Sequence, residues 1–322
     1  MPDRPLESFS RFNYLLRPSK QVERKLFIEA LHRLALGNFR IHEYTYLGFG
    51  SPYYADFILF HKYLYIDSMI CVEKESIPRR MEFNQPFKFI KLKMMPVADV
   101  LPQLKRGAKY IVWLDYDYLL NTEILNEIAG FIYLLSPGSI LIITVEAEPR
   151  LPLDEDDGEM SGNQREDRLF QILQEQLGKY YPGTIRRNLI ARNALPTFFS
   201  EILRSRLEEQ ASKREGLQFF QLFNFKYADG AHMLTVGGML GNDESAKQLR
   251  NSGVYNLSFI ETGSEPKRIS VPPLTVREKQ WLERNLRKSL TSSKLAFELD
   301  AEFVETFRQF YRHYPTYYET LI

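Results

Sequence analysis

The sequence predicts a three-layer α/β fold whose mainly parallel sheet ends in an antiparallel hairpin. Short apolar strands alternate with helical segments as far as residue 145, a rhythm typical of parallel sheets covered on both faces. An Asp229-Gly230 pair between two later apolar runs is a strong hairpin signal. The chain has 322 residues, a length that allows one large domain with an appendage, or two domains, and 44% of them are apolar, which is enough for a sizeable core.

A helix and a strand open the predicted domain. Apolar residues recur at helical spacing from Ser19, which is a suitable N-cap, to Gly37, where a helix can end. A short aromatic and β-branched run over residues 44–47 then predicts the first strand.

A glycine-rich turn follows the first strand. Gly48-Phe49-Gly50 interrupts the apolar run, and Ser51-Pro52 comes directly after it. Serine is a favoured N-cap, and proline is favoured at the first helical position. We therefore expect a second helix from Pro52 to about Tyr65.

Four more strands complete the parallel part of the predicted sheet. The next strand is buried and ends at Glu73, and a later one ends in Asp115-Tyr116-Asp117-Tyr118. A helix over about 122–135 separates that strand from the last of the series. The four predicted strands span residues 69–72, 89–94, 111–114 and 140–145.

The alternation of short strands and helices ends after residue 145. A polar and acidic stretch precedes two helices at about 166–178 and 197–213, and the hairpin strands follow at 219–227 and 232–240. Two amphipathic helices are expected near 275–290 and 299–312. We therefore divide the chain into an N-terminal arm (1–18), an α/β domain (19–240) with a helical insertion (149–216), and a helical C-terminal extension (241–322).

Composition excludes several classes of protein. Lys and Arg number 42 and Asp and Glu number 41, so binding to nucleic acid through bulk charge is not indicated. A single cysteine, Cys71, excludes a disulfide framework and a Cys-rich zinc site. No apolar run reaches the roughly 18 residues of a membrane span, and the N-terminus lacks the apolar region of a signal peptide. We expect a cytoplasmic protein.

The glycine-rich turn suits a nucleotide-like cofactor. Glycines let the backbone approach a ligand, and the following helix start offers free N–H groups. Glu73, which lies 23 residues after Gly50, could accept the two hydrogen bonds of a ribose diol. The dinucleotide-binding motif G-x-G-x-x-G would need a third glycine, and the chain has Tyr53 there. The alternative interpretation of Gly48 and Gly50 is a tight turn without a ligand.

Asp115, Asp117 and Tyr118 are the candidate catalytic residues. The carboxyl end of a strand in an open α/β sheet is where ligands bind. A carboxylate there could act as a general base on a hydroxyl or hold a substrate amine, and Tyr118 could stack on a planar acceptor. Asp115 could instead cap the next helix. A divalent ion held by both aspartates would need a third ligand that the sequence does not supply, so we expect no metal.

The parallel sheet with a closing hairpin resembles class I S-adenosylmethionine (SAM)-dependent methyltransferases over about residues 19–240. The segments RPSKQVERKLFIEALHRL, YLGFGSPYYADFILFHK and VWLDYDYLL are also similar to bacterial proteins catalogued as putative O-methyltransferases. The resemblance implies a Rossmann-like fold with SAM as cofactor. It implies Glu73 as the ribose acid, residues 114–118 as the motif after strand four, and a first cofactor motif at Tyr46, Gly48, Phe49, Gly50 and Ser51.

Two segments depart from the pattern of that family. The first motif usually opens with an acid, where this chain has Tyr46-Leu47. The family often places an Asp after strand three, near the adenine, where this chain has Met94-Met95-Pro96. Both departures concern the cofactor site, so they bear on whether SAM binding is retained.

The expected activity is SAM-dependent methyl transfer to an oxygen or nitrogen acceptor, with Asp115 as base or positioning group. The first alternative is a catalytically inactive protein of this fold that serves as a binding or scaffolding subunit, with a protein partner bound through the terminal helices. The second is a nucleic-acid-modifying methyltransferase. Several cations could contact phosphate or simply face solvent: Lys20, Arg24, Arg186, Arg187 and Arg192.

Overall fold

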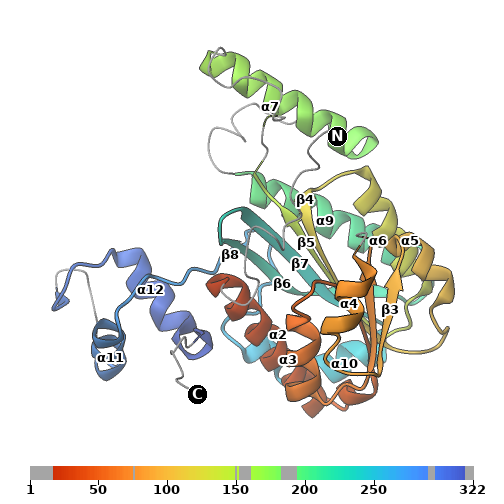
Figure 1. Cartoon of the computed structure of the whole chain (residues 1–322), viewed down its shortest axis with the longest axis horizontal. Coiled ribbons are helices and arrows are strands. Elements are labelled where there is room, and N and C mark those ends of the chain that lie inside the picture. The colour runs from red at the N-terminus through yellow and green to blue at the C-terminus, as the bar shows by residue number, and fades with distance from the viewer. Residues whose placement is uncertain are drawn as a thin grey trace.

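The computed structural model of the chain describes residues 17–74, 77–148, 151, 161–182, 194–288 and 294–315 (Figure 1). The acidic stretch 152–160 and the arginines at 186, 187 and 192 lie outside the described residues, as does most of the predicted N-terminal arm. None of the helices within the described ranges combines the length and apolar character needed to span a membrane.

The described strands form one sheet in the order β3-β2-β1-β4-β5-β7-β6-β8. Strands β1 to β5 pair in parallel, β7 is antiparallel to both β5 and β6, and β8 adds a short parallel edge beside β6. The predicted parallel sheet with a closing antiparallel hairpin is therefore confirmed. The strands are β1 (Thr45–Phe49), β2 (Ser68–Glu73), β3 (Ile90–Met94), β4 (Tyr110–Leu119), β5 (Ile140–Glu146), β6 (Gln218–Ala228), β7 (His232–Gly241) and β8 (Lys267–Arg268).

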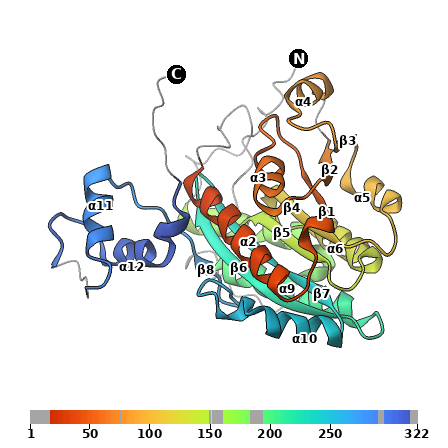
Figure 2. The ribbon, with the colours of Figure 1, turned by 90° about the horizontal axis from the view of Figure 1, so that it is seen from below.

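Helices cover both faces of this sheet (Figure 2). One face carries α2 (Pro18–Leu36), α3 (Ala55–Leu64), α4 (Pro78–Asn84) and α10 (Asp243–Ser252), and the other carries α5 (Val97–Val100), α6 (Thr122–Leu134) and α9 (Leu195–Ser212). Helices α4, α5 and α10 were not anticipated from the sequence. Three helices lie further out, α7 (Gly162–Leu177), α11 (Val276–Arg284) and α12 (Ala301–Phe310) (Figure 1).

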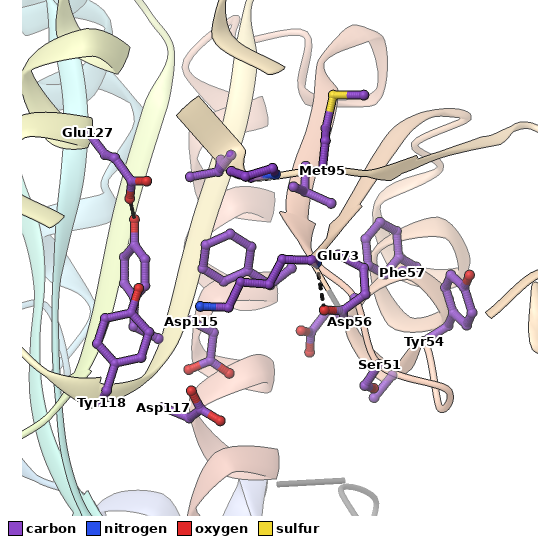
Figure 3. A pocket seen from close by; sticks show the side chains of 18 of the residues that line it. Ser51, Tyr54, Asp56, Phe57, Glu73, Met95, Asp115, Asp117, Tyr118 and Glu127 are labelled. Carbon is purple, nitrogen blue, oxygen red and sulfur yellow. Dashed lines mark hydrogen bonds between the residues drawn. The ribbon is translucent and has the colours of Figure 1, made fainter. Parts of the chain in front are cut away.

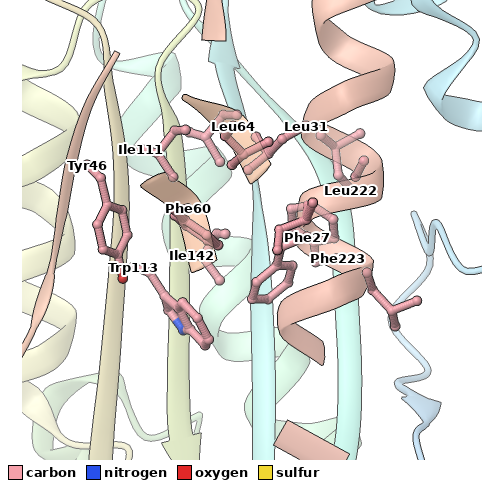
Figure 4. Close-up of a cluster of buried hydrophobic side chains, with 14 of the residues drawn as sticks. Phe27, Leu31, Tyr46, Phe60, Leu64, Ile111, Trp113, Ile142, Leu222 and Phe223 are labelled. Carbon is pink, nitrogen blue, oxygen red and sulfur yellow. The ribbon is translucent and has the colours of Figure 1, made fainter. Parts of the chain in front are cut away.

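Alternating side chains of the central strands fill two cores. Ile111 and Trp113 of β4 face α2 and α3, whereas Val112 and Leu114 face the opposite layer. The ring of Phe27 from α2 meets the ring of Trp113 edge-on, at 4.9 Å between centroids (Figure 4). Each large apolar side chain buried in this way contributes roughly 1.5–3 kcal/mol to the stability of the fold. Packing on both faces therefore stabilises the observed strand order.

Helix α2 does not begin with a serine cap. It starts at Pro18, and Arg17 at the N-cap position forms no side-chain cap hydrogen bond. The carboxylate of Asp229, in the β6–β7 turn, instead accepts from the backbone N–H groups of Ser19 at 3.1 Å and Lys20 at 2.9 Å. A residue about 210 positions away thus satisfies the free donors of the helix, which no local pattern could predict.

The second helix also begins later than predicted. Residues 52 and 53 form a turn, and α3 starts at Ala55. Tyr54 occupies the N-cap position with φ 46°, in the left-handed region, and its hydroxyl donates to the carbonyl of Met81 at 3.0 Å. That buried contact holds Tyr54 in a conformation uncommon for a non-glycine residue, and it moves the helix start three residues along the chain.

Strand β4 continues through the predicted catalytic motif instead of ending before it. It runs to Leu119, and its pairing with β5 shifts register between Asp115 and Leu119. Asn121 caps the following helix, because its side chain accepts from the N–H of Ile124 at 2.9 Å. The alternative interpretation of Asp115 as the cap of that helix is therefore wrong.

Gly238 of β7 provides a test of the hairpin geometry. A Cβ at this position would lie 2.1 Å from the backbone oxygen of Phe220, and a paired strand cannot move aside as a flexible side chain can. We expect Gly238→Ala to lower the free energy of unfolding by about 1–3 kcal/mol in urea denaturation. Gly162→Ala, where a Cβ would meet nothing within 4 Å, is the control, and equal effects of the two changes would contradict the described pairing.

Candidate functional site

A pocket lies at the carboxyl ends of β1, β2, β3 and β4, where open α/β sheets bind ligands. It holds about 1060 Å³ of empty space, including space open to solvent at its mouth. In Figure 3, Ser51, Tyr54 and Phe57 form one side, Asp115, Asp117 and Tyr118 form the other, and Glu73 lies between them. The strand order therefore brings together residues from four separate parts of the sequence.

The β1–α3 turn contributes Phe49, Gly50 and Ser51 to the pocket wall. A Cβ on Gly50 would lie 2.6 Å from the sulfur of Cys71 and 2.7 Å from the terminal methyl of Met81. The turn thus sits tightly against β2 and α4, and a larger residue at position 50 would have to displace the side chains of Cys71 and Met81.

Tyr46 and Gly48 do not line this pocket. The ring of Tyr46 packs between Phe57 and Phe60 in the core, and burial raises the pKa of its hydroxyl well above the usual range. Gly48 makes room for that ring, because a Cβ there would lie 2.3 Å from the tyrosine oxygen. The structure gives both residues packing roles, so the expectation that they contact a cofactor has no geometric support.

Glu73 ends β2 at the pocket, as its position in the sequence predicts. Its Oε1 accepts from the backbone N–H of Lys74 at 2.9 Å. The residues that follow β3, Met95, Pro96 and Val97, supply an apolar wall nearby. A ribose beside the carboxylate and a planar base beside this wall are the ligand groups such an arrangement can hold.

Asp115 is held by a buried lysine. Its Oδ1 accepts from Nζ of Lys20 at 2.7 Å, and the exposed fractions of the two side chains are 19% for the aspartate and 0% for the lysine. The same ammonium lies 3.0 Å from Glu23 Oε2, donates to the hydroxyl of Tyr227 at 2.9 Å and lies 4.4 Å from the ring centre of Trp113. Asp115 is therefore part of a buried charge cluster.

Glu23 is the innermost acid of this cluster. Burial raises the pKa of its carboxyl group, although Lys20 and the hydroxyl of Thr235 act in the opposite direction. Thr235 donates to Glu23 Oε1 at 2.5 Å, and Tyr227 donates to Oε2 at 3.2 Å. These bonds tie α2 to the β6–β7 hairpin beneath the pocket.

A second buried cation of α2, Arg24, lines the pocket directly, whereas Lys20 does not. Arg24 forms a salt bridge through Nε to Asp56, in the first turn of α3. Burial alone would lower the pKa of the guanidinium, but the charge of Asp56 keeps it raised. The pair joins α2 to the start of α3, and both residues line the pocket.

The other residues of the β4 motif, 116–118, differ in their surroundings. Asp117 is exposed at the pocket, and the ammonium of Lys74 lies 5.2 Å from the ring centre of Tyr118. Tyr116 donates to the carboxylate of Glu127 on α6, and burial raises the pKa of that carboxyl group. No three potential ligands within the described ranges are grouped to hold a metal ion.

The sequence alone did not reveal Lys20, Glu23 and Arg24 as residues beneath or beside the site. A signal existed, because Lys20, Glu23 and Arg24 precede Phe27 at intervals of seven, four and three residues. That spacing places the charges on the apolar face of α2, where they must be buried and paired.

The chain belongs to the family described as "Putative O-methyltransferase", whose model matches residues 12–322. This match confirms the methyltransferase resemblance. No curated protein matches the sequence.

Remote similarity extends to solved methyltransferase structures. The N-methyltransferase NodS from Bradyrhizobium japonicum, in complex with S-adenosylhomocysteine, is 11% identical over 69% of this chain and 88% of its own, with a TM-score of 0.36. The O-methyltransferase TomG from Streptomyces achromogenes, in complex with SAM, is 14% identical over 75% and 93%, with a TM-score of 0.36. A 16S rRNA adenine methyltransferase from Catenulisporales acidiphilia, with SAM, is 14% identical over 66% and 90%, with a TM-score of 0.36.

The raised pKa of Glu127 predicts a pH-dependent stability. Above about pH 4.5, the usual pKa of a glutamate, the unfolded chain loses this proton before the folded chain does, so the folded state loses relative stability as pH rises. Glu127→Gln cannot lose a proton and can still accept from Tyr116. We expect the free energy of unfolding of the variant to increase relative to that of the parent as the pH rises above about 4.5, measured by urea denaturation. A difference independent of pH would contradict this.

Proposed function

We propose that this methyltransferase-family protein transfers a methyl group from SAM to an oxygen or nitrogen atom of an acceptor. One observation carries the proposal. A single pocket joins the turn after β1, the acid that ends β2, the apolar wall after β3 and the aspartates of β4. These are the features that a nucleoside with a charged side chain requires in an open α/β sheet.

The charge of the pocket supports a cationic cofactor. Its lining carries two cations, Arg24 and Lys74, and six carboxylate side chains, from Asp56, Glu73, Asp115, Asp117, Glu123 and Glu127. SAM has a positive sulfonium and a positive ammonium group, which this excess of carboxylates would stabilise. Glu73 would hold the ribose, and the wall at residues 95–97 would contact the adenine.

The protein's own groups would orient the acceptor and handle its proton. SAM supplies an electrophilic methyl group when it is bound. Asp115 and Asp117 lie on the same side of the pocket (Figure 3), where a carboxylate can accept a hydrogen bond from a hydroxyl or amine. Because Lys20 already holds one oxygen of Asp115, Asp115 suits the orientation of the acceptor, and the exposed Asp117 suits removal of its proton.

A second candidate function is a catalytically inactive binding subunit. The observation that favours it is that Asp115 takes part in a buried ion pair, which a purely structural residue would also do. The outlying helices α11 and α12 would then offer a surface for a protein partner. SAM binding without methyl transfer to any acceptor would favour this alternative.

The acid-rich pocket argues against a nucleic-acid acceptor. If the acceptor were RNA or DNA, the affinity of the protein for it would fall steeply with rising salt. A cytoplasmic location stays a prediction.

Calorimetry with SAM tests the cofactor assignment. We expect micromolar binding to the parent protein, and a loss of about 1–3 kcal/mol in Glu73→Ala, because the ribose hydroxyls would lose their acceptor. Glu43→Gln, an exposed acid paired with Arg40 outside the pocket, should bind SAM as the parent does. Absence of heat from folded parent protein would refute the proposal.

The excess of carboxylates also predicts a preference between cofactor and product. S-adenosylhomocysteine lacks the sulfonium charge, so we expect it to bind more weakly than SAM by about 1 kcal/mol at low salt. Asp117→Asn should bring the two dissociation constants closer together. Equal affinities in the parent protein, measured in the same buffer, would show that the pocket charges do not act on the sulfonium.

A further inference from the structure

Lys20 is a buried cation that has no access to the pocket except through Asp115. Its side chain is 0% exposed and is absent from the pocket lining, whereas Asp115 belongs to that lining. Its ammonium group has three oxygen neighbours, on Asp115, Glu23 and Tyr227, at 2.7, 3.0 and 2.9 Å. Such an arrangement satisfies all three of its donors and fixes them in space.

Stability alone is a weak reason to keep this cluster. Burying a lysine and two carboxylates carries a large desolvation cost, and well-packed apolar side chains can often replace buried ion pairs without loss of stability. The neighbours of Lys20 include large apolar surfaces, such as the ring of Trp113 at 4.4 Å. The presence of the buried cluster is therefore better explained by a role that an apolar residue could not perform.

The position of the ammonium is set by the β6–β7 hairpin. Asp229 in its turn accepts from the backbone N–H of Lys20 at 2.9 Å. Tyr227 of β6 holds the ammonium directly, and Thr235 of β7 holds Glu23 at 2.5 Å. Lys20 is thus restrained at both its backbone and its ammonium group. Through its hydrogen bond to Oδ1, the restrained ammonium fixes the position of the Asp115 carboxylate.

We propose that Lys20 is a positioning residue, which holds Oδ1 of Asp115 so that the other carboxylate oxygen is presented to the ligand. Within the described residues, that second oxygen has no hydrogen-bond partner, whereas Oδ1 is bound at 2.7 Å. An aspartate restrained through one oxygen loses less rotational freedom when a ligand binds the other. The inference rests on the proposed function, because Asp115 is taken to be one of the carboxylates that stabilise the positive groups of bound SAM, as well as to orient the acceptor.

The first measurement requires no cofactor. An ammonium group that is buried and fully hydrogen-bonded exchanges its protons slowly, so Lys20 should give a ¹H–¹⁵N signal at neutral pH that exposed lysines do not give. The signal should disappear in Lys20→Met and shift in Asp115→Asn. Lys25→Met is the matched control on the same helix, since the ammonium of Lys25 donates to the carbonyl of Tyr314 instead.

The second measurement is a double-mutant cycle on SAM binding by calorimetry. We expect Lys20→Met to raise the dissociation constant about tenfold in the parent protein, with little further effect in Asp115→Asn. A purely structural lysine would weaken binding by the same factor in both backgrounds, and that result would overturn the proposal. If Lys20→Met does not fold, Lys20→Met combined with Glu23→Gln, which removes one charge of each sign, takes its place and is compared with Glu23→Gln.

The two measurements distinguish a failure of the cofactor assignment from a failure of the positioning role of Lys20. If folded parent protein gives the Lys20 signal but no heat with SAM, the cofactor assignment fails. The positioning proposal then also fails as stated, although the Lys20–Asp115 bond is real. If SAM binds and the cycle shows no coupling between Lys20 and Asp115, the cofactor assignment stands and only the positioning role is lost.

Discussion

The buried ammonium group of Lys20 is the point at which the elements around the pocket are joined. It belongs to α2 and contacts β4 through Asp115 and Trp113 and β6 through Tyr227. Its neighbour on the same helix, Arg24, reaches the start of α3 through Asp56. A charge removed from water must be paired, so these contacts constrain how α2 can lie on the sheet. Both ion pairs join α2 to residues that line the pocket, Asp115 and Asp56.

The strand order of the sheet brings the polar residues of the pocket together. Because β1 lies between β2 and β4, with β3 beyond β2, the turn after β1 is flanked by Glu73 on one side and by Asp115 and Asp117 on the other. The antiparallel hairpin makes its contribution from beneath, through Tyr227 and Thr235. The residues that support Asp115 therefore come from two distant parts of the chain, α2 and the β6–β7 hairpin, and both parts pack against the core around Trp113.

Much of this arrangement could be predicted from local sequence patterns. The strand–helix alternation and the Asp229-Gly230 turn predicted the parallel sheet and its hairpin. The predicted strand ends also placed Glu73, Asp115 and Asp117 at one edge, although β4 continues through the aspartates to Leu119. Local patterns were wrong where a distant contact decided the outcome. The carboxylate of Asp229 replaced the expected Ser19 cap, and the Tyr54–Met81 hydrogen bond delayed α3 beyond Pro52. Lys20 and Arg24 were ambiguous because charge alone does not indicate burial.

A crystal structure of the protein with S-adenosylhomocysteine would test most directly the claim that the pocket over β1 to β4 is the cofactor site. We predict that the ribose lies against Glu73, the base against the wall at residues 95–97, and the homocysteine portion toward Asp115, with the Lys20–Asp115 bond intact. A ligand bound elsewhere, for example in the second cavity beside Tyr227 and His232, would contradict it. So would a ligand in this pocket that makes no contact with either acid.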